Sequence, residues 1–308
     1  MRVFQHPPSR RSRRPARPRP AAAVAAALAV LAAIALTPAA AGAQGSTAGA
    51  SSAEASSPDA RAWRFPVGER AVYDVTVALG SVTSPRPLGE ARLSVEDRER
   101  IDGTPAYRTT LEVEGGVPML YRMDDRQVSW IAPDPIRALR YEERLREGDY
   151  RRDRRYRLDQ EAGTYTRYDR EDGGWRRVEE ETGVPMPENA LDEVSFLYFV
   201  RSLPLEPGAT YRYERFFEAD GNPVVLEVLE RERVRVPAGR FETVVVRPII
   251  QTDGLFGEGG RAKVWITDDE RRIIVKIEST MKVGRVNMHL RSYEPGGPLA
   301  DRTDGSGF

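Results

Sequence analysis

The chain has 308 residues, of which 40% are hydrophobic, with 47 basic and 47 acidic side chains, two histidines and no cysteine. The lack of thiols excludes disulfides and a lipid-modified N-terminal cysteine, and so few histidines exclude a site built from His and Cys ligands. Without residues 1–43, which hold seven arginines and no acid, the net charge becomes −7. That balance argues against general nucleic-acid binding and against adhesion to anionic lipid.

The N-terminal segment has the three parts of an export signal. Residues 2–19 are rich in arginine, residues 21–36 are continuously apolar, and Ala41-Gly42-Ala43 matches a small-x-small cleavage site. The apolar run is shorter than the roughly 20 residues of a membrane-spanning helix. We predict a signal peptide at 1–43 and a periplasmic or envelope-located product without a transmembrane segment. Paired arginines leave the general and twin-arginine export routes both open.

Composition divides the remainder into three parts. Residues 44–62 contain Ser, Ala and Gly with almost no large apolar side chain, so we expect a disordered linker. Residues 63–294 contain no long linker and are predicted to form a single β-rich domain. The tail at 295–308, rich in Gly, Pro and Asp, is expected to be disordered.

Alternation of apolar and polar residues predicts half-buried strands at 71–79 and 107–114. Farther along, Gly148-Asp149 suits the turn of a hairpin. The expected cross-strand pairs are Leu139–Leu158, Arg140–Arg157, Tyr141–Tyr156, Glu142–Arg155 and Arg144–Asp153. Residues 164–178 continue this meander through a glycine-rich turn.

One segment changes from the strand period to a helical period. Within residues 189–203, the apolar side chains Leu191, Val194, Leu197, Tyr198 and Phe199 recur at helical spacing. Asn189 or Asp192 can serve as the N-cap, and Pro204 ends the pattern. We predict one helix lying across the sheet, where it plugs an end or lines a concavity.

Strands are predicted again at 211–217, 224–236 and 241–250, with Pro237-Ala238-Gly239 as a three-residue hairpin loop. Gly284-Arg285 suits a two-residue turn, because glycine adopts a positive φ without strain. The pairs expected from that turn are Val283–Val286, Met281–Met288, Ser279–Leu290, Ile277–Ser292, Lys282–Asn287, Thr280–His289 and Glu278–Arg291. This register produces one apolar and one polar face.

The strands and turns predict an all-β protein: a large curved antiparallel sheet, either a partial barrel or a sandwich, with one helix packed against it. Curvature hides the apolar faces and leaves a concave interior of the kind that binds ligands.

Several phrases resemble the bacterial domain of unknown function 3108 family. They are Pro66-Val67-Gly68-Glu69, Leu191-Asp192 with Tyr198-Phe199-Val200-Arg201-Ser202-Leu203-Pro204-Leu205, Val236-Pro237-Ala238-Gly239-Arg240-Phe241-Glu242-Thr243, Gly254-Leu255-Phe256, Val264-Trp265-Ile266-Thr267-Asp268-Asp269-Glu270-Arg271-Arg272 and Ile277-Glu278-Ser279. The likeness covers residues 65–293 and implies an exported or envelope-located bacterial β-protein. It implies no reaction, substrate or catalytic residue.

Motifs for catalysis are sparse. A serine triad is disfavoured because the chain has no G-x-S-x-G and keeps only His289, which we place on a polar hairpin face. The acidic clusters Asp124-Asp125 and Asp268-Asp269-Glu270 are expected in turns, where Asp bonds to backbone amides. A glycosidase-like carboxylate pair and a loop-built calcium site stay open as alternatives.

Two further segments have simple interpretations. The Arg- and Tyr-rich hairpin at 139–158 is interpreted as a solvated edge strand, which charge protects against pairing. The loop at 254–260 lacks the Lys-Ser/Thr pair of a phosphate-binding loop, and it is either an apolar lip beside a cleft or a long hairpin loop.

These observations favour a non-enzymatic envelope protein that binds an apolar or amphipathic molecule, or a partner, in the sheet concavity. The predicted contacts are Tyr198, Phe199, Leu255, Phe256 and Trp265, and no cofactor or metal is expected. One alternative is a scaffolding protein that pairs through a sheet edge. The other is a hydrolase with paired carboxylates.

Overall fold

The computed structural model describes residues 66–79, 86–117, 119, 121–250, 262–281 and 284–297. The predicted signal peptide, the linker and the loop at 254–260 lie outside these residues, as does the tail from 298 onward.

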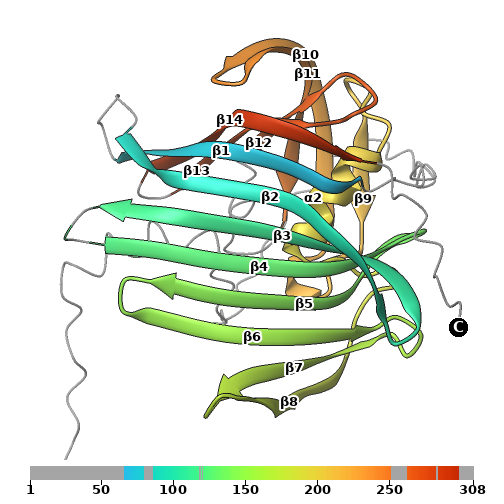
Figure 1. Cartoon of the computed structure of the whole chain (residues 1–308). Coiled ribbons are helices and arrows are strands. Elements are labelled where there is room, and N and C mark those ends of the chain that lie inside the picture. The colour runs from blue at the N-terminus through green and yellow to red at the C-terminus, as the bar shows by residue number, and fades with distance from the viewer. Residues whose placement is uncertain are drawn as a thin grey trace, which may run out of the picture.

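The described strands form one antiparallel sheet in the order β8-β7-β6-β5-β4-β3-β2-β1-β14-β13-β12-β11-β10-β9 (Figure 1). They are β1 (Val67–Leu79), β2 (Arg86–Ile101), β3 (Thr104–Val117), β4 (Tyr121–Pro133), β5 (Ile136–Glu147), β6 (Tyr150–Asp159), β7 (Thr164–Glu171), β8 (Gly174–Pro185), β9 (Thr210–Tyr213), β10 (Val224–Val236), β11 (Gly239–Ile249), β12 (Ala262–Thr267), β13 (Ile274–Met281) and β14 (Gly284–Gly297). Two meanders meet where β1 pairs with β14. The sheet is not closed, because β8 and β9 are its two edges, and the prediction of a curved antiparallel sheet is confirmed.

The helix α2 (Glu193–Ser202) leads from one edge strand to the other and lies within the curve of the sheet (Figure 1). Of the two predicted N-caps, Asp192 is the one used: its carboxylate accepts hydrogen bonds from the amides of Val194 and Ser195. Asn189 instead adopts a positive φ of 52°. Every residue from Val194 to Ser202 is buried, in agreement with the mostly apolar composition of this segment. A short 3-10 helix, η2 (Ala219–Gly221), follows β9.

The hairpin turn predicted at Gly148-Asp149 is confirmed, with Tyr141 opposite Tyr156 and Glu142 opposite Arg155. Leu139 does not face Leu158, however, because the register of β4 and β5 shifts between Trp130 and Ile131. Leu139 therefore joins a small cluster outside the main core. The interpretation of this hairpin as a sheet edge is also wrong, since β6 pairs with both β5 and β7.

Three predictions near the C-terminus need correction. Met281 is opposite Gly284, so the β13–β14 turn lies two residues earlier than predicted. Ile277 is therefore opposite Met288 instead of Ser292. An even shift keeps every side chain on its expected face, which is why alternation alone did not reveal it. The β10–β11 loop is shorter than expected, because Val236 already pairs with Gly239. The strand predicted at 211–217 is only β9, which ends at Tyr213.

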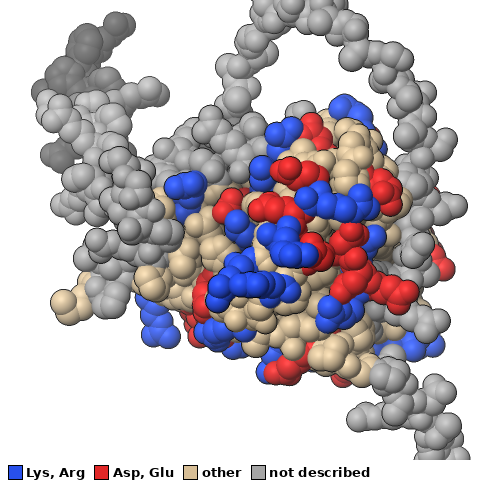
Figure 2. All heavy atoms as spheres, turned by 90° about the horizontal axis from the view of Figure 1, so that it is seen from above, with Lys and Arg blue, Asp and Glu red and all other residues tan. Residues whose placement is uncertain are grey.

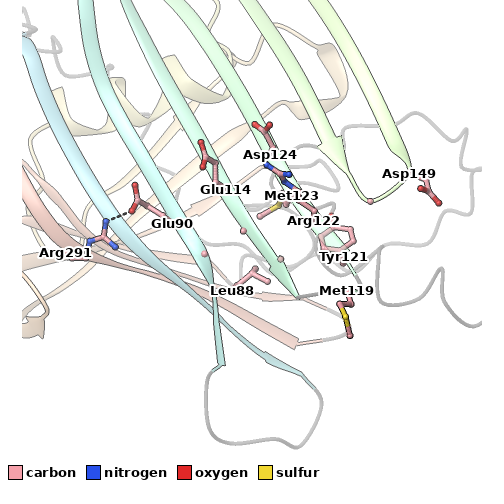
Figure 3. A pocket seen from close by; sticks show the side chains of 14 residues that line it. Leu88, Glu90, Glu114, Met119, Tyr121, Arg122, Met123, Asp124, Asp149 and Arg291 are labelled. Carbon is pink, nitrogen blue, oxygen red and sulfur yellow. Dashed lines mark hydrogen bonds and ion pairs between the residues drawn. The ribbon is translucent and has the colours of Figure 1, made fainter.

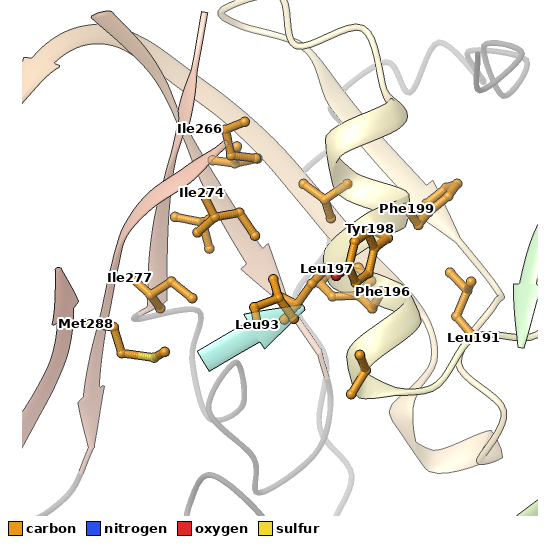
Figure 4. Close-up of a cluster of buried hydrophobic side chains, with 14 of the residues drawn as sticks. Leu93, Leu191, Phe196, Leu197, Tyr198, Phe199, Ile266, Ile274, Ile277 and Met288 are labelled. Carbon is orange, nitrogen blue, oxygen red and sulfur yellow. The ribbon is translucent and has the colours of Figure 1, made fainter. Parts of the chain in front are cut away.

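The main core lies between α2 and the inward side chains of both halves of the sheet. Leu197 and Tyr198 of the helix face Ile266, Ile274 and Ile277 across the concave side (Figure 4). A smaller cluster on the outer side of the sheet contains Ile101, Ala106, Val128, Trp130, Ala132 and Leu139. Acidic and basic side chains are interspersed over the face seen from above (Figure 2).

Candidate functional site

The side chains of β4 have the reverse of the usual inside-outside polarity. Asp125, Gln127 and Ser129 point into the concavity and are buried, whereas Val128 and Trp130 point outward into the small cluster. Burying polar groups is unfavourable unless they gain hydrogen bonds or ion pairs. Such a violation of the folding pattern is typical of a functional surface.

Neighbouring strands extend this polar floor. We call it the carboxyl recess and define it by its inward side chains on β4 to β7 and by the two glutamates that cover them. These residues are Asp125, Gln127, Glu143, Glu147, Arg152, Arg154, Arg167, Asp169, Glu193 and Glu218. Six carboxyl groups thus line the recess together with three arginines.

One ion pair anchors the floor of the recess. The guanidinium Nη2 of Arg152 lies 2.9 Å from Oε2 of Glu143, and the two side chains are only 7% and 5% exposed. Burial nevertheless raises the pKa of Glu143, despite the lowering effect of Arg152 and Arg154. Oε1 of Glu143 has no hydrogen-bond partner among the described residues.

A pair of carboxyl groups occupies one end of the recess. Burial raises the pKa of both Asp125 and Glu147, and the neighbouring Asp125 carboxyl raises the pKa of Glu147 further. The backbone amide of Arg146 donates a hydrogen bond to Oδ1 of Asp125 at 2.8 Å. Within the described chain, Oδ2 of Asp125 and Oε1 of Glu147 are buried without a partner. Two acids in this arrangement favour a shared proton.

Two glutamates from outside the strands cover the recess. Glu193 begins α2, and Glu218 comes from the segment between β9 and η2. Burial is the main cause that raises the pKa of Glu193 well above its ordinary value and the pKa of Glu218 to about 7. Glu143 contributes repulsion to both. Oε2 of Glu193 and the hydroxyl of Tyr141 are buried without partners in the described part of the chain.

An aromatic wall separates the recess from the apolar core. The ring of Phe217 lies 5.0 Å from that of Tyr156 and 5.2 Å from that of Tyr165 in edge-on geometry. Tyr141 stacks on Tyr156 with ring centroids 5.9 Å apart. The segment carrying Glu218 is therefore held in place by its neighbour Phe217.

An open pocket of about 860 Å³ adjoins the Asp125–Glu147 end of the recess. Tyr121, Met123 and Gly148 line it (Figure 3), and Met123 is directly opposite Glu147 in the sheet. Burial and the two carboxyls raise the pKa of Tyr121, whose hydroxyl has no partner among the described residues. Tyr121 is therefore the residue that connects this pocket with the Asp125–Glu147 pair.

The recess can accept hydrogen bonds and positive charge from a ligand. Its free carboxyl oxygen atoms and raised pKa values show that the arginines of the recess do not satisfy all of its carboxyl groups. Within the described ranges, no group of three or more His, Cys, Asp or Glu side chains is arranged to hold a metal ion. A cationic or hydroxyl-bearing group fits this chemistry best.

The residues predicted as ligand contacts are not brought together at one surface. Tyr198 and Phe199 are fully buried on α2 in the main core. Trp265 lies on the face of β12 opposite to Ile266, where its indole donates to Glu232 at 2.8 Å and the Lys276 ammonium covers its ring. Leu255 and Phe256 lie outside the described residues.

The acidic clusters have two different outcomes. The turn prediction is confirmed for Asp269, whose carboxylate accepts hydrogen bonds from the hydroxyl of Thr267 and the amide of Arg271. It is wrong for Asp124-Asp125, which lie within β4. The sequence pattern is ambiguous here: Asp125 shares a strand face with Met123 and Gln127, and the alternation with Asp124 and Arg126 does not indicate which face is buried. His289 lies on β14 opposite Lys276, not opposite Thr280.

The described residues form an all-β fold, an open antiparallel sheet that curves around one helix. The chain belongs to the DUF3108 family of proteins of unknown function, whose model matches residues 72–291. A search of curated proteins found no match. Within the described residues, no helix is long and apolar enough to cross a membrane.

Solved structures with low sequence identity also match this chain. One is a β-barrel-like protein of the DUF1849 domain from Brucella abortus, with 10% identity, 75% of this chain and 98% of that chain covered, and a TM-score of 0.47. Another is an exported-protein candidate with a YmcC-like fold from Bacteroides fragilis, with 12% identity, coverages of 76% and 99%, and a TM-score of 0.27. A lipoprotein candidate from Parabacteroides distasonis has 9% identity, coverages of 75% and 97%, and a TM-score of 0.28.

The recess makes stability depend on pH. The pKa of Glu147 rises from 4.5 to about 8 in the folded protein, so the folded state retains a proton that the unfolded state loses. Stability from this group is complete below the unfolded pKa and is lost as pH rises from 4.5 toward 8. Glu147→Gln should therefore raise the melting temperature at pH 9 and change it little at pH 4, as measured by circular dichroism.

Glu179→Gln is the matched control, because Glu179 has a side chain that is 76% exposed on β8 and the substitution makes the same charge change. An equal gain at pH 9 from both variants would show that net charge, rather than burial of Glu147, causes the effect.

Proposed function

We propose that this is an exported envelope protein without enzymatic activity that binds an amphipathic ligand in the concavity of its sheet. The polar end of the ligand, an amine or a hydroxylated group, enters the carboxyl recess. Support for export comes from the N-terminal sequence, with its arginine-rich start, apolar run and small-x-small site.

One observation supports the binding proposal above all others: Oε1 of Glu143, Oε2 of Glu193 and the hydroxyl of Tyr141 are buried without a partner among the described residues. An unsatisfied buried polar group costs about 1–3 kcal/mol, so several in one place favour a ligand that supplies donors. A positively charged donor would also offset the repulsion among the carboxylates.

The apolar end of the ligand has aromatic neighbours. Tyr141, Tyr156 and Phe217 adjoin the carboxyls, and the pocket at Tyr121 provides the route from solvent. Of the contacts inferred from sequence, Leu255 and Phe256 stay part of the proposal, whereas Trp265 lies on the other face of its strand, away from the concavity. Tyr198 and Phe199 would act from beneath, as part of the packed helix that supports the recess.

The edges of the sheet make strand-to-strand assembly the weaker alternative. β8 is irregular: its register with β7 shifts twice, and the hydroxyl of Thr182 donates to the carbonyl of Val178 within the strand. β9 has only four residues. Bulged and short edges are the devices that prevent strand addition.

The test compares two detergents of equal chain length, dodecylamine and dodecanoate, below their micelle concentrations. Isothermal titration calorimetry should show binding of dodecylamine and little or none of dodecanoate. Glu143→Gln combined with Glu193→Gln should weaken dodecylamine binding by about tenfold or more, because each glutamine keeps one acceptor oxygen but cannot carry the negative charge that pairs with the ammonium.

Glu142→Gln is the matched control. Glu142 is next to Glu143 in the sequence, but its side chain lies on the outer face of β5, where it pairs with Arg155. Equal binding of both detergents, or equal loss in the control, would refute the role of the recess.

The second candidate function, acid-base hydrolysis by Asp125 and Glu147, rests on their adjacent carboxyls. Glycosidase activity that disappears in Glu147→Gln would replace the binding proposal.

A further inference from the structure

A second pocket, of about 650 Å³, lies beside the tip of the β10–β11 hairpin. Arg235, Arg240 and His289 line it, together with Val236, Pro237 and Gly239, and its lining contains no acidic residue. It shares no residue with the carboxyl recess. A lining with two arginines and a histidine, on a chain that is acidic beyond residue 43, indicates an anionic ligand.

The two arginines face each other across the hairpin. Arg235 is directly opposite Arg240 in the β10–β11 register, so their side chains leave the same face of neighbouring strands. Like charges in this position are destabilising. Neither arginine has an ion pair among the described residues, whereas Arg233 on the same face pairs with Glu242. The repulsion would be relieved by an anion between the two guanidinium groups.

The hairpin tip is fixed against β14, which brings His289 to the pocket. The amide of Ala238 donates to the carbonyl of Leu290 at 2.9 Å, next to His289 in sequence. His289 is opposite Lys276 on β13 and Asp74 on β1. The nearby acids have other partners: Asp74 pairs with Arg291, and Glu278 with Lys276. Burial and Lys276 lower the pKa of His289, and its imidazole has an N–H donor in either protonation state.

We propose that this pocket binds a phosphate group, held between the guanidinium forks of Arg235 and Arg240 with His289 as a further hydrogen-bond donor. Arginine forks match the oxygen geometry of phosphate, and its negative charge offsets the repulsion between the two guanidinium groups. The phosphate belongs either to a soluble compound or to a lipid headgroup. This site is independent of the proposed function.

Binding is measured with the purified protein in low-salt buffer at pH 7, using inorganic phosphate in calorimetry and thermal-shift assays. The wild type should bind phosphate and melt at a higher temperature in its presence. The double variant Arg235→Ala with Arg240→Ala should bind at least about tenfold more weakly. His289→Gln should weaken binding by a smaller factor, and Arg233→Ala, the ion-paired control, should bind like the wild type.

Cosedimentation with phosphatidylglycerol vesicles and with phosphatidylcholine vesicles identifies the source of the phosphate. Phosphatidylglycerol binding that the double variant loses supports a lipid headgroup, and phosphate binding without vesicle binding supports a soluble compound. Thermal melting confirms that each variant is folded. A wild type that binds neither phosphate nor phosphatidylglycerol, or a double variant that binds as well as the wild type, overturns the proposal.

Discussion

Replacing Gly115 by alanine is expected to destabilise the protein by more than about 3 kcal/mol, the range of severe overpacking. Gly115 of β3 is directly opposite Gly89 of β2. A Cβ at Gly115 would overlap the carbonyl oxygen of Leu88 and lie 2.8 Å from the Cα of Gly89. These are backbone atoms, so no side chain can rotate away, and the two strands would have to separate.

The effect is measured by urea unfolding followed by circular dichroism. Gly174→Ala is the matched control: Gly174 begins β8, and a Cβ there would have its nearest neighbour, the carbonyl oxygen of Glu171, at 3.8 Å. We expect the control to change stability by less than about 1 kcal/mol. A Gly115→Ala variant as stable as the control would mean that β2 and β3 can move apart without loss. Gly115 also lines the pocket at Tyr121, so the contact shapes that pocket.

Replacing Arg201 by methionine should destabilise the fold by about 3–5 kcal/mol, because it leaves a buried charge without its partner. The guanidinium of Arg201 binds both carboxylate oxygens of Glu69, at 2.5 and 3.1 Å, and these side chains are only 3% and 4% exposed. Its Nε also donates to the carbonyl of Arg272, and Tyr293 donates to the same carboxylate. This network joins α2 to β1 and to the loop before β13.

A double-mutant cycle separates the ion pair from general packing. Glu69→Leu combined with Arg201→Met should be less destabilised than the sum of the two single variants, because no buried charge is left alone. Arg176→Met is the surface control. Arg176 of β8 pairs with Glu171 of β7, with 68% and 55% of the side chains exposed, and its loss should change stability by less than about 1 kcal/mol. Additive effects in the cycle would contradict the coupling.

The N-terminus of α2 connects this helix, which carries Arg201, to the carboxyl recess. Asp192 is fully buried, and the hydroxyl of Ser129 donates to its carboxylate at 2.6 Å. This bond fixes the start of α2 against β4, so that Glu193 projects over the floor formed by Glu143. The helix therefore stabilises the open sheet at its C-terminal end and completes the recess at its N-terminal end.

Local chemistry explains which predictions from sequence were confirmed. The Gly148-Asp149 turn and the Tyr141–Tyr156 pair depend on residues close together in the chain, and the helix depends on Asp192 as its cap and on the apolar spacing behind it. By contrast, the β13–β14 turn was misplaced by two residues, because the side-chain pattern is unchanged by an even shift.

The carboxyl recess was beyond sequence reasoning for a different reason. Asp125, Glu143 and Glu193 come from three separate elements, and each has the polarity expected of a surface residue. Asp125 and Val128 lie on opposite faces of β4. Alternation alone does not determine which of the two faces inward, because that depends on which face of β4 is covered by other segments. The sequence by itself determined an antiparallel β-protein with one buried helix, because hydrophobic period, turns and caps act over short distances. Only the tertiary structure decided that part of the concave face is acidic, because burial is set by segments that meet only after the sheet has curved around the helix.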